Sequence, residues 1–264
     1  MNRYKQTARI LFACGMIGLG ILGLTYGDFA LQWQPVPSGF AGREVLAYLV
    51  ALLMIAGGIG LLFRRTVTIA TRILFPYLLL WLLLKVSAIA AAPLVEGAWL
   101  GFGEIAVLAA GGWILFARLS GLAETTTLGA CVGSRGVRAA QTLFALSLMP
   151  IGLSHFVYLS ETAALVPAWL PFRAVWACLT GAGHIAAGLG VLFSIFPRLA
   201  GMLEAAMLSV FTALVWIPAI VAHPGVRLNW TAFVISGAIS AGAWVVAASL
   251  ARSTLATTYN WSPV

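Results

Sequence analysis

The stretch that decides the fold is Met54-Ile-Ala-Gly-Gly-Ile-Gly-Leu-Leu-Phe63, because the sequence contains it a second time as His184-Ile-Ala-Ala-Gly-Leu-Gly-Val-Leu-Phe193. The two copies are 130 positions apart. A second block returns at nearly the same offset, with Trp99, Gly111 and Trp113 matched by Trp230, Gly242 and Trp244. A constant offset across separated blocks is typical of internal duplication. The sequence therefore predicts two copies of one structural unit.

Composition excludes a soluble globular protein. The chain is 62% hydrophobic and only 8% charged, with a mean hydropathy of +1.02, whereas about a quarter of the residues of a soluble domain are charged. At about 20 residues per span, 264 residues accommodate about eight transmembrane helices. The sequence has no basic cluster interleaved with aromatic residues, so we expect no nucleic-acid partner and take the lipid bilayer as the main one.

The apolar runs predict an all-α integral membrane protein of two parallel four-helix repeats. We expect helices over residues 8–26, 44–63, 68–90, 98–117, 138–157, 173–193, 198–220 and 230–250. The first repeat is then 1–120, a cytoplasmic linker is 121–137, the second repeat is 138–250, and a polar tail is 251–264. Prolines around tryptophan in 28–44 and 158–173 predict short interfacial segments between helices.

The basic residues predict the orientation. Eleven of the fifteen fall on one side of the proposed membrane: Arg3, Lys5, Arg9, Arg64, Arg65, Arg72, Arg118, Arg135, Arg138, Arg198 and Arg252. Because cytoplasmic loops are enriched in Lys and Arg, both termini are expected in the cytoplasm of a bacterial cell, with the chain in its cytoplasmic (inner) membrane. Four spans per repeat insert both units the same way up.

The second half resembles the DoxX family of small four-helix membrane proteins. The resemblance rests on Val166-Pro-Ala-Trp-Leu-Pro171, Gly181-Ala-Gly-His-Ile-Ala-Ala-Gly188, Trp216-Ile-Pro218 and Asn229-Trp230, and it covers about residues 138–250. The first half resembles the same unit more weakly, and its proline segment is reduced to Pro35-Val-Pro37. Because DoxX-like proteins include subunits of thiosulfate:quinone oxidoreductase, the resemblance implies a quinone ligand and a partner oxidoreductase subunit.

Ionisable residues inside spans are the candidates for chemistry, because each costs about 2.5–3.5 kcal/mol to insert. In the first repeat these are Lys85 and Glu104, which neighbouring helices place at similar depth. A buried ion pair is one interpretation; the others are a proton or substrate site, or a lysine that extends to the surface beside a neutral acid.

In the second repeat, His184 and Glu204 are predicted to lie close together on consecutive helices. A carboxylate beside an imidazole fixes its tautomer and suits a proton relay or a hydrogen bond to a quinone ring. We therefore predict a ligand pocket in this repeat, lined by His184 and Glu204 with Trp169, Trp176 and Trp216 as apolar walls. The alternative is a structural histidine that is satisfied by a backbone carbonyl or serine.

No metal or haem site is expected. His184 is predicted to lie about 10 Å deeper than His155, which disfavours these two as axial ligands of one haem iron. His155 and His223 are better matched in depth, but no spacing signal supports that pair. Whether the chain is an enzyme stays open at this point. A quinone-linked or redox-associated component, a non-catalytic assembly factor and a small-molecule transporter are all compatible with the sequence.

Overall fold

The computed structural model describes residues 3–250, and over that range the chain is helical and contains no strand. Eight helical segments within it are long and apolar enough to cross a membrane: α1 (Arg3–Tyr26), α2 (Arg43–Leu62), α3 (Val67–Ala91), α4 (Glu96–Leu119), α5 (Gly133–Val157), α7 (Arg173–Leu192), α8–α9 (Pro197–Ala222) and α10 (Arg227–Ser249). Short helices η1 (Leu31–Trp33), η2 (Gly129–Cys131) and α6 (Leu159–Leu165) lie between them. The predicted all-α fold with eight apolar spans is confirmed.

The starts of two spans differ from the sequence prediction. α1 begins at Arg3 and not at residue 8, and α5 begins at Gly133, inside the predicted linker. The predicted tail, 251–264, lies outside the described residues. The seventh span is also interrupted: α8 (Pro197–Phe211) passes through a π-helical turn, η3 (Thr212–Trp216), into α9 (Ile217–Ala222). Pro218 explains the interruption, because a proline has no amide hydrogen and its ring clashes with the carbonyl four residues earlier.

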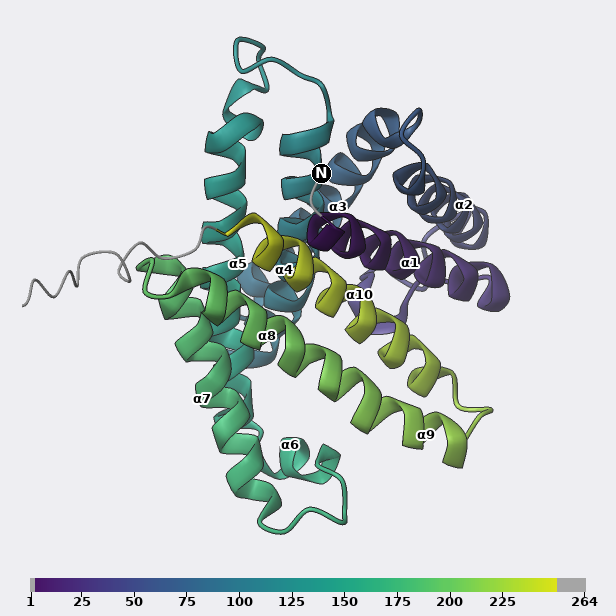
Figure 1. The fold of residues 1–264 in the computed structure, drawn as a ribbon. Coiled ribbons are helices and arrows are strands. Elements are labelled where there is room, and N and C mark those ends of the chain that lie inside the picture. Colours follow the sequence, from purple (N-terminus) through teal and green to yellow (C-terminus); the bar gives the residue numbers. More distant parts are fainter. Residues whose placement is uncertain (1–2, 251–264) are drawn as a thin grey trace, which may run out of the picture.

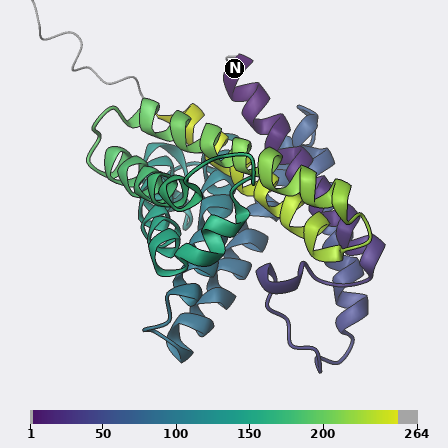
Figure 2. The same cartoon turned by 90° about the horizontal axis from the view of Figure 1, so that it is seen from below.

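Within each half of the molecule, each long helix packs on the next long helix. In the first half α1 packs on α2, α2 on α3, and α3 on α4; in the second half α5 packs on α7, α7 on α8, and α8 on α10. The two halves meet where α4 packs on α5 and where α10 packs on α1. Figure 1 shows α10 running between α1 and α8, and Figure 2 shows α8–α9 and α10 side by side from a second direction.

The centre of the molecule is the contact between α4 and α10, the two most buried spans. A Cβ atom placed on Gly111 of α4 would lie 2.6 Å from the Cα atom of Gly242 on α10. A Cβ on Gly242 would in turn lie 2.9 Å from the carbonyl oxygen of Val107. Since small residues allow helix backbones to approach closely in a membrane, these two glycines set the distance between the halves.

The two glycine-rich segments, 51–60 and 181–190, have similar surroundings. Residues 51–60 of α2 and 181–190 of α7 share the same order of buried, half-buried and exposed positions. A Cβ on Gly58 would lie 2.8 Å from the carbonyl oxygen of Ala13, and one on Gly188 would lie 2.6 Å from that of Ala145. The glycines of the two segments therefore allow the close approach of α2 to α1 and of α7 to α5.

An ionic cluster fastens the loop after α1 to the start of α10. Asp28 accepts hydrogen bonds from Arg43 and from Arg227, the latter at 2.9 Å, and Arg227 also donates to the carbonyl oxygen of Phe29 at 2.8 Å. Burial opposes ionisation of the Asp28 carboxyl, but the hydrogen bonds from Arg227, the Phe29 amide and Arg43 together hold the pKa of Asp28 below its usual value. The cluster therefore links the two halves of the chain.

Candidate functional site

His184 of α7 and Glu204 of α8 form the most completely buried polar contact described in the protein. The Nδ1 atom of His184 lies 2.8 Å from Oε1 of Glu204, and the side chains are 1% and 0% exposed. A tight turn after α7 brings the two helices together. Ser194 and Phe196 adopt positive φ angles in this turn, and Pro197 then begins α8. The structure thus brings together the two residues that the sequence singled out.

The hydrogen bond links the tautomer of His184 to the ionisation state of Glu204. An ionised carboxylate only accepts hydrogen bonds, so with Glu204 ionised the Nδ1 atom of His184 is the donor to Oε1. The second carboxylate oxygen, Oε2, is buried and has no hydrogen-bond partner in the described chain. Because a buried polar atom without a partner typically costs about 1–3 kcal/mol, Oε2 is available to an additional donor.

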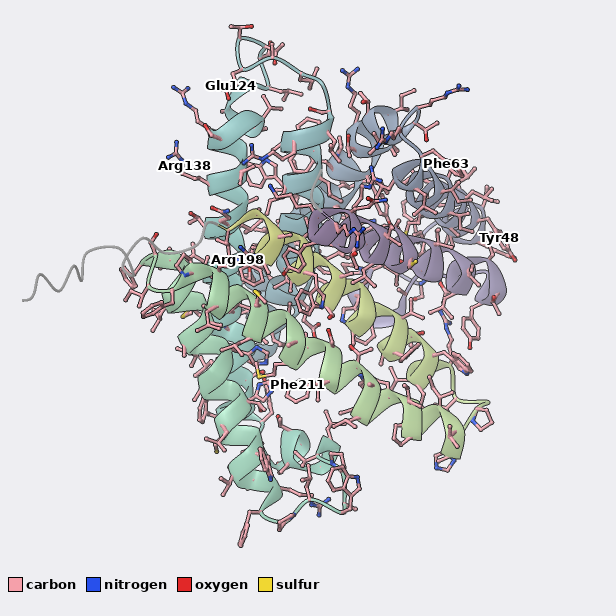
Figure 3. The ribbon with its side chains drawn as sticks, viewed as in Figure 1. Tyr48, Phe63, Glu124, Arg138, Arg198 and Phe211 are labelled. Atoms are coloured by element: carbon pink, nitrogen blue, oxygen red, sulfur yellow. The ribbon has the colours of Figure 1, made fainter. Side chains whose placement is uncertain are left out.

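His155 and Phe211 complete the surroundings of the pair. The ring centroids of His155 and His184 are 5.1 Å apart, and Phe211 lies 6.5 Å from His155 and 6.3 Å from His184. Phe211, labelled on α8 in Figure 3, lies on the side of that helix facing α7. Nδ1 of His155 contacts the carbonyl oxygen of Ile151 at 2.9 Å, which fixes this ring to its own helix.

The predicted depth difference of about 10 Å between His155 and His184 is wrong. It assumed that α5 and α7 end at the same level. In the structure, the Cβ atom of His155 lies beside Gly181, at 2.7 Å from a Cβ built there, one turn before His184. The start of α7 therefore extends beyond the end of α5. As a result His184, in the middle of α7, lies level with His155, which is close to the end of α5.

A groove between α7 and α8 has Glu204 in its wall. It has a volume of about 430 Å³ and runs from the turn at Ile195 and Phe196 to the middle of both helices. Its other lining residues are small or aliphatic: Gly183, Ala186, Ala187, Leu189, Gly190, Leu199, Ala200, Leu203 and Met207. Leu199 and Leu203 are more than half exposed, so this groove opens on the apolar outer surface of the bundle.

The three tryptophans proposed as pocket walls lie elsewhere. Trp169 precedes α7 and is 72% exposed, and Trp176 is an exposed residue near the start of α7. Trp216, in the π-helical turn, donates a hydrogen bond to Ser236 of α10 at 3.1 Å. None of them lines the groove beside Glu204. Sequence reasoning grouped them because they share a repeat, whereas the walls of the groove are aliphatic.

In the first repeat the structure places Lys85 and Glu104 on adjoining faces of α3 and α4. Lys85 is buried, and its Nζ atom lies against Gly101, one turn from Glu104. The Glu104 carboxylate accepts a hydrogen bond from Nε1 of Trp33 at 2.8 Å, and the neighbouring Gln34 donates to the hydroxyl of Tyr77 at 2.7 Å. The proposed Lys85–Glu104 ion pair remains a prediction.

Trp33 and Gln34 are site residues that sequence reasoning missed. Both belong to the segment after α1, which the sequence indicated only as an interfacial connection between spans. Their side chains instead reach inward and fasten that segment to α3 and α4. No signal in the sequence singled out Gln34, because the same segment also contains Asp28 and Ser38.

No metal-ligating cluster occurs within residues 3–250: no three His, Cys, Asp or Glu side chains there are placed to hold one ion. His223 follows α9 at the end of the seventh span, apart from the other two histidines in sequence. Cys14, Cys131 and Cys178 are all free thiols. The described site is therefore a hydrogen-bonded acid–imidazole pair beside an apolar groove.

The fold and this site define a multi-pass, all-helical protein of the lipid bilayer. A family model described as a domain of unknown function (DUF8561) matches residues 144–224. That segment runs from the middle of α5 to the end of α9 and contains His155, His184 and Glu204. Nothing matches among the curated proteins compared, and nothing matches among the solved structures.

Proposed function

We propose that the chain is a tandem DoxX-like protein whose second repeat binds a quinone-type ligand from the bilayer. The observation that carries this proposal is Glu204, a buried carboxylate in the wall of a groove that opens on the outer apolar surface. A lipid-soluble ring with polar substituents fits such a groove, because aliphatic side chains contact its tail while one buried polar group orients its head. His184 is hydrogen-bonded to the Glu204 carboxylate, and its imidazole can accept or return a proton.

The proposed repeats are parallel and related by an axis near the membrane normal. Gly111 and Gly242 support this arrangement, because they are equivalent in sequence and contact one another, as equivalent residues do at a twofold axis. The indole hydrogen bonds of Trp99 to the carbonyl oxygen of Pro93 and of Trp230 to that of Pro224 are also equivalent, at 2.9 and 2.8 Å.

The first repeat supplies an internal comparison for the site. At the positions equivalent to His184 and Glu204 it has Met54 and Leu74, which are buried in the same way. The two apolar residues show that this position in the fold needs no polar pair for packing. A specific role in the second repeat is therefore the better explanation of the histidine and the carboxylate.

The proposed setting is a bacterial cytoplasmic membrane, with both termini in the cytoplasm and a partner oxidoreductase subunit that exchanges electrons with the quinone. The orientation is supported by the concentration of arginines at one set of helix ends, such as Arg64, Arg118 and Arg198. The partner subunit is proposed on the DoxX-like resemblance alone.

Photo-crosslinking with an azidoquinone tests the proposal in native membranes. Labelled peptides are expected from α7 and α8, and Ala186→Phe, which fills the groove, is expected to reduce labelling about ten-fold or more. The matched control is Ala56→Phe, because Ala56 is the equivalent exposed alanine on α2. Labelling confined to α1–α4 contradicts the proposal. Absence of labelling throughout favours a non-catalytic assembly factor, and mass spectrometry of co-purified chains then identifies its partners.

A further inference from the structure

We infer that Glu204 makes the site selective for ligands whose head group carries an O–H donor, so that a quinol binds more tightly than the corresponding quinone. This inference rests on the proposed function and adds to it the form of the ligand that the site prefers. Its basis is the unequal use of the two carboxylate oxygens. Glu204 is a specificity-determining residue in this arrangement.

The first step concerns the oxygen that remains free. Oε1 of Glu204 lies 2.8 Å from Nδ1 of His184, and the ionised carboxylate accepts that hydrogen bond. Oε2 is buried without a partner among the described residues. A carboxylate oxygen accepts and does not donate, so a hydroxyl group of the ligand satisfies it and a carbonyl group does not.

The second step concerns what else the groove offers. Glu204 is the only lining residue with a polar side chain; the other eleven are glycine, alanine, aliphatic residues, phenylalanine and methionine. The carbonyl oxygens of a quinone therefore meet no side-chain donor in the groove. A ligand that buries acceptors without donors loses their hydrogen bonds to water, whereas a hydroxyl placed on Oε2 removes an existing unsatisfied atom.

The third step concerns how a ligand in the groove reaches the Glu204 carboxylate. The Sδ atom of Met207 lies 3.4 Å from a Cβ built on Gly183, so the methionine side chain covers this glycine one turn from Glu204. Methionine has three rotatable bonds and changes conformation at low cost. The Glu204 side chain is 0% exposed, so the proposal requires a lining side chain to move before a ligand reaches the carboxylate, and Met207 is the candidate.

The test compares ligands that differ only in the donor. The full chain in lipid nanodiscs is titrated anaerobically with an alkyl-substituted benzoquinone and its quinol, and separately with a long-chain alkylphenol and its methyl ether. The wild type is expected to bind each hydroxyl form about ten-fold more tightly or better, since one such hydrogen bond is worth at least about 1.4 kcal/mol. In Glu204→Gln, whose amide both donates and accepts, the ratio is expected to approach one.

The outcomes separate the two proposals. If neither form of either ligand binds the wild type, the proposed function fails. If both forms bind equally, or the quinone and the ether bind more tightly, the proposed function stands and the selectivity of Glu204 is overturned. The ratio of affinities in the wild type decides this even if Glu204→Gln is unstable. The double variant His184→Met/Glu204→Leu carries the residues of the first repeat and is a second protein expected not to distinguish the two forms of each ligand.

Discussion

Gly111 of α4 and Gly242 of α10 contact each other through their backbones, at 2.6 Å between a Cβ built on Gly111 and the Cα of Gly242. No side chain fits between them without moving a helix. Gly111→Ala and Gly242→Ala are each expected to destabilise the protein by about 1–3 kcal/mol, because the added methyl group meets backbone atoms. The midpoint of thermal unfolding in detergent measures this change.

Gly237, on the same helix α10, is the control for that prediction. A Cβ there would lie 3.8 Å from Thr212, which is ordinary contact. Gly237→Ala is therefore expected to be neutral or to stabilise α10 by up to about 1 kcal/mol. Equal destabilisation by all three substitutions would contradict the close contact between α4 and α10.

Substitutions of His184 and Glu204 are predicted to have strongly non-additive effects on the free energy of unfolding. His184→Met leaves a buried carboxylate without its donor and is expected to destabilise by about 3–5 kcal/mol. Glu204→Leu leaves a histidine that can stay neutral, so a smaller loss of about 1–3 kcal/mol is expected. The double variant reproduces Met54 and Leu74 of the first repeat and should be close to wild type. A double-mutant cycle of unfolding free energies checks this, and strict additivity argues against the pair.

The Asp28 cluster predicts a stability that depends on acid pH. The pKa of Asp28 is lowered in the folded state, so its stabilising effect is complete above its unfolded value of about 3.9 and is lost as the pH falls through the folded value. Asp28→Asn is expected to lower stability by about 1.5–3 kcal/mol at pH 7. The difference between variant and wild type should disappear in strong acid. Thermal unfolding between pH 7 and pH 2 measures it, and a constant difference would exclude the linkage.

Coupling between Lys85 and Glu104 is expected through the electrostatic attraction of their charges. Lys85→Met and Glu104→Gln should each destabilise the protein much more than the double variant does, because each single change leaves the other buried charge unpaired. Purely additive effects in the double variant would rule the pair out. Trp33→Phe removes the indole donor to Glu104 and is expected to cost about 1.5–3 kcal/mol. Unfolding of the single and double variants in detergent measures these effects. Trp99→Phe is the control, because its indole bonds only to the exposed turn at Pro93.

The proposed topology predicts the location of reporter fusions. Phosphatase or fluorescent-protein fusions after Arg64, Arg118, Arg198 and Arg252 are all expected to report the cytoplasm. The first three lie at or near an end of a span in the structure, and Arg252 lies outside the described residues. A periplasmic report after Arg118 would remove the model of parallel repeats, because the two units would then have opposite orientations.

The sequence was a good guide to the elements and to one side-chain contact. Long apolar runs predicted the eight spans because a bilayer demands length and hydrophobicity, and both are visible in a single sequence. The contact of His184 with Glu204 was predictable because a short turn leaves consecutive helices little freedom. The π-helical turn before Pro218 was missed, since a proline near a helix end fits either an ending or an interruption.

Contacts that depend on how far one helix extends past another could not be predicted. His155 was placed too far from His184 because the level of a helix end is a property of packing and not of spacing. Trp33 was missed for a related reason, since a loop can return into the bundle and donate to Glu104 from there. The aliphatic groove beside Glu204 leaves no pattern in the sequence that separates it from ordinary lipid-facing surface.

The difference between Met54 with Leu74 and His184 with Glu204 bears on the stoichiometry of the proposed ligand. Two identical subunits around a twofold axis always carry any polar pair twice. Two halves joined in one chain are free to differ, so at these positions one half has two apolar residues and the other has a histidine and a carboxylate. If the proposed function holds, we expect binding to saturate at one ligand per polypeptide.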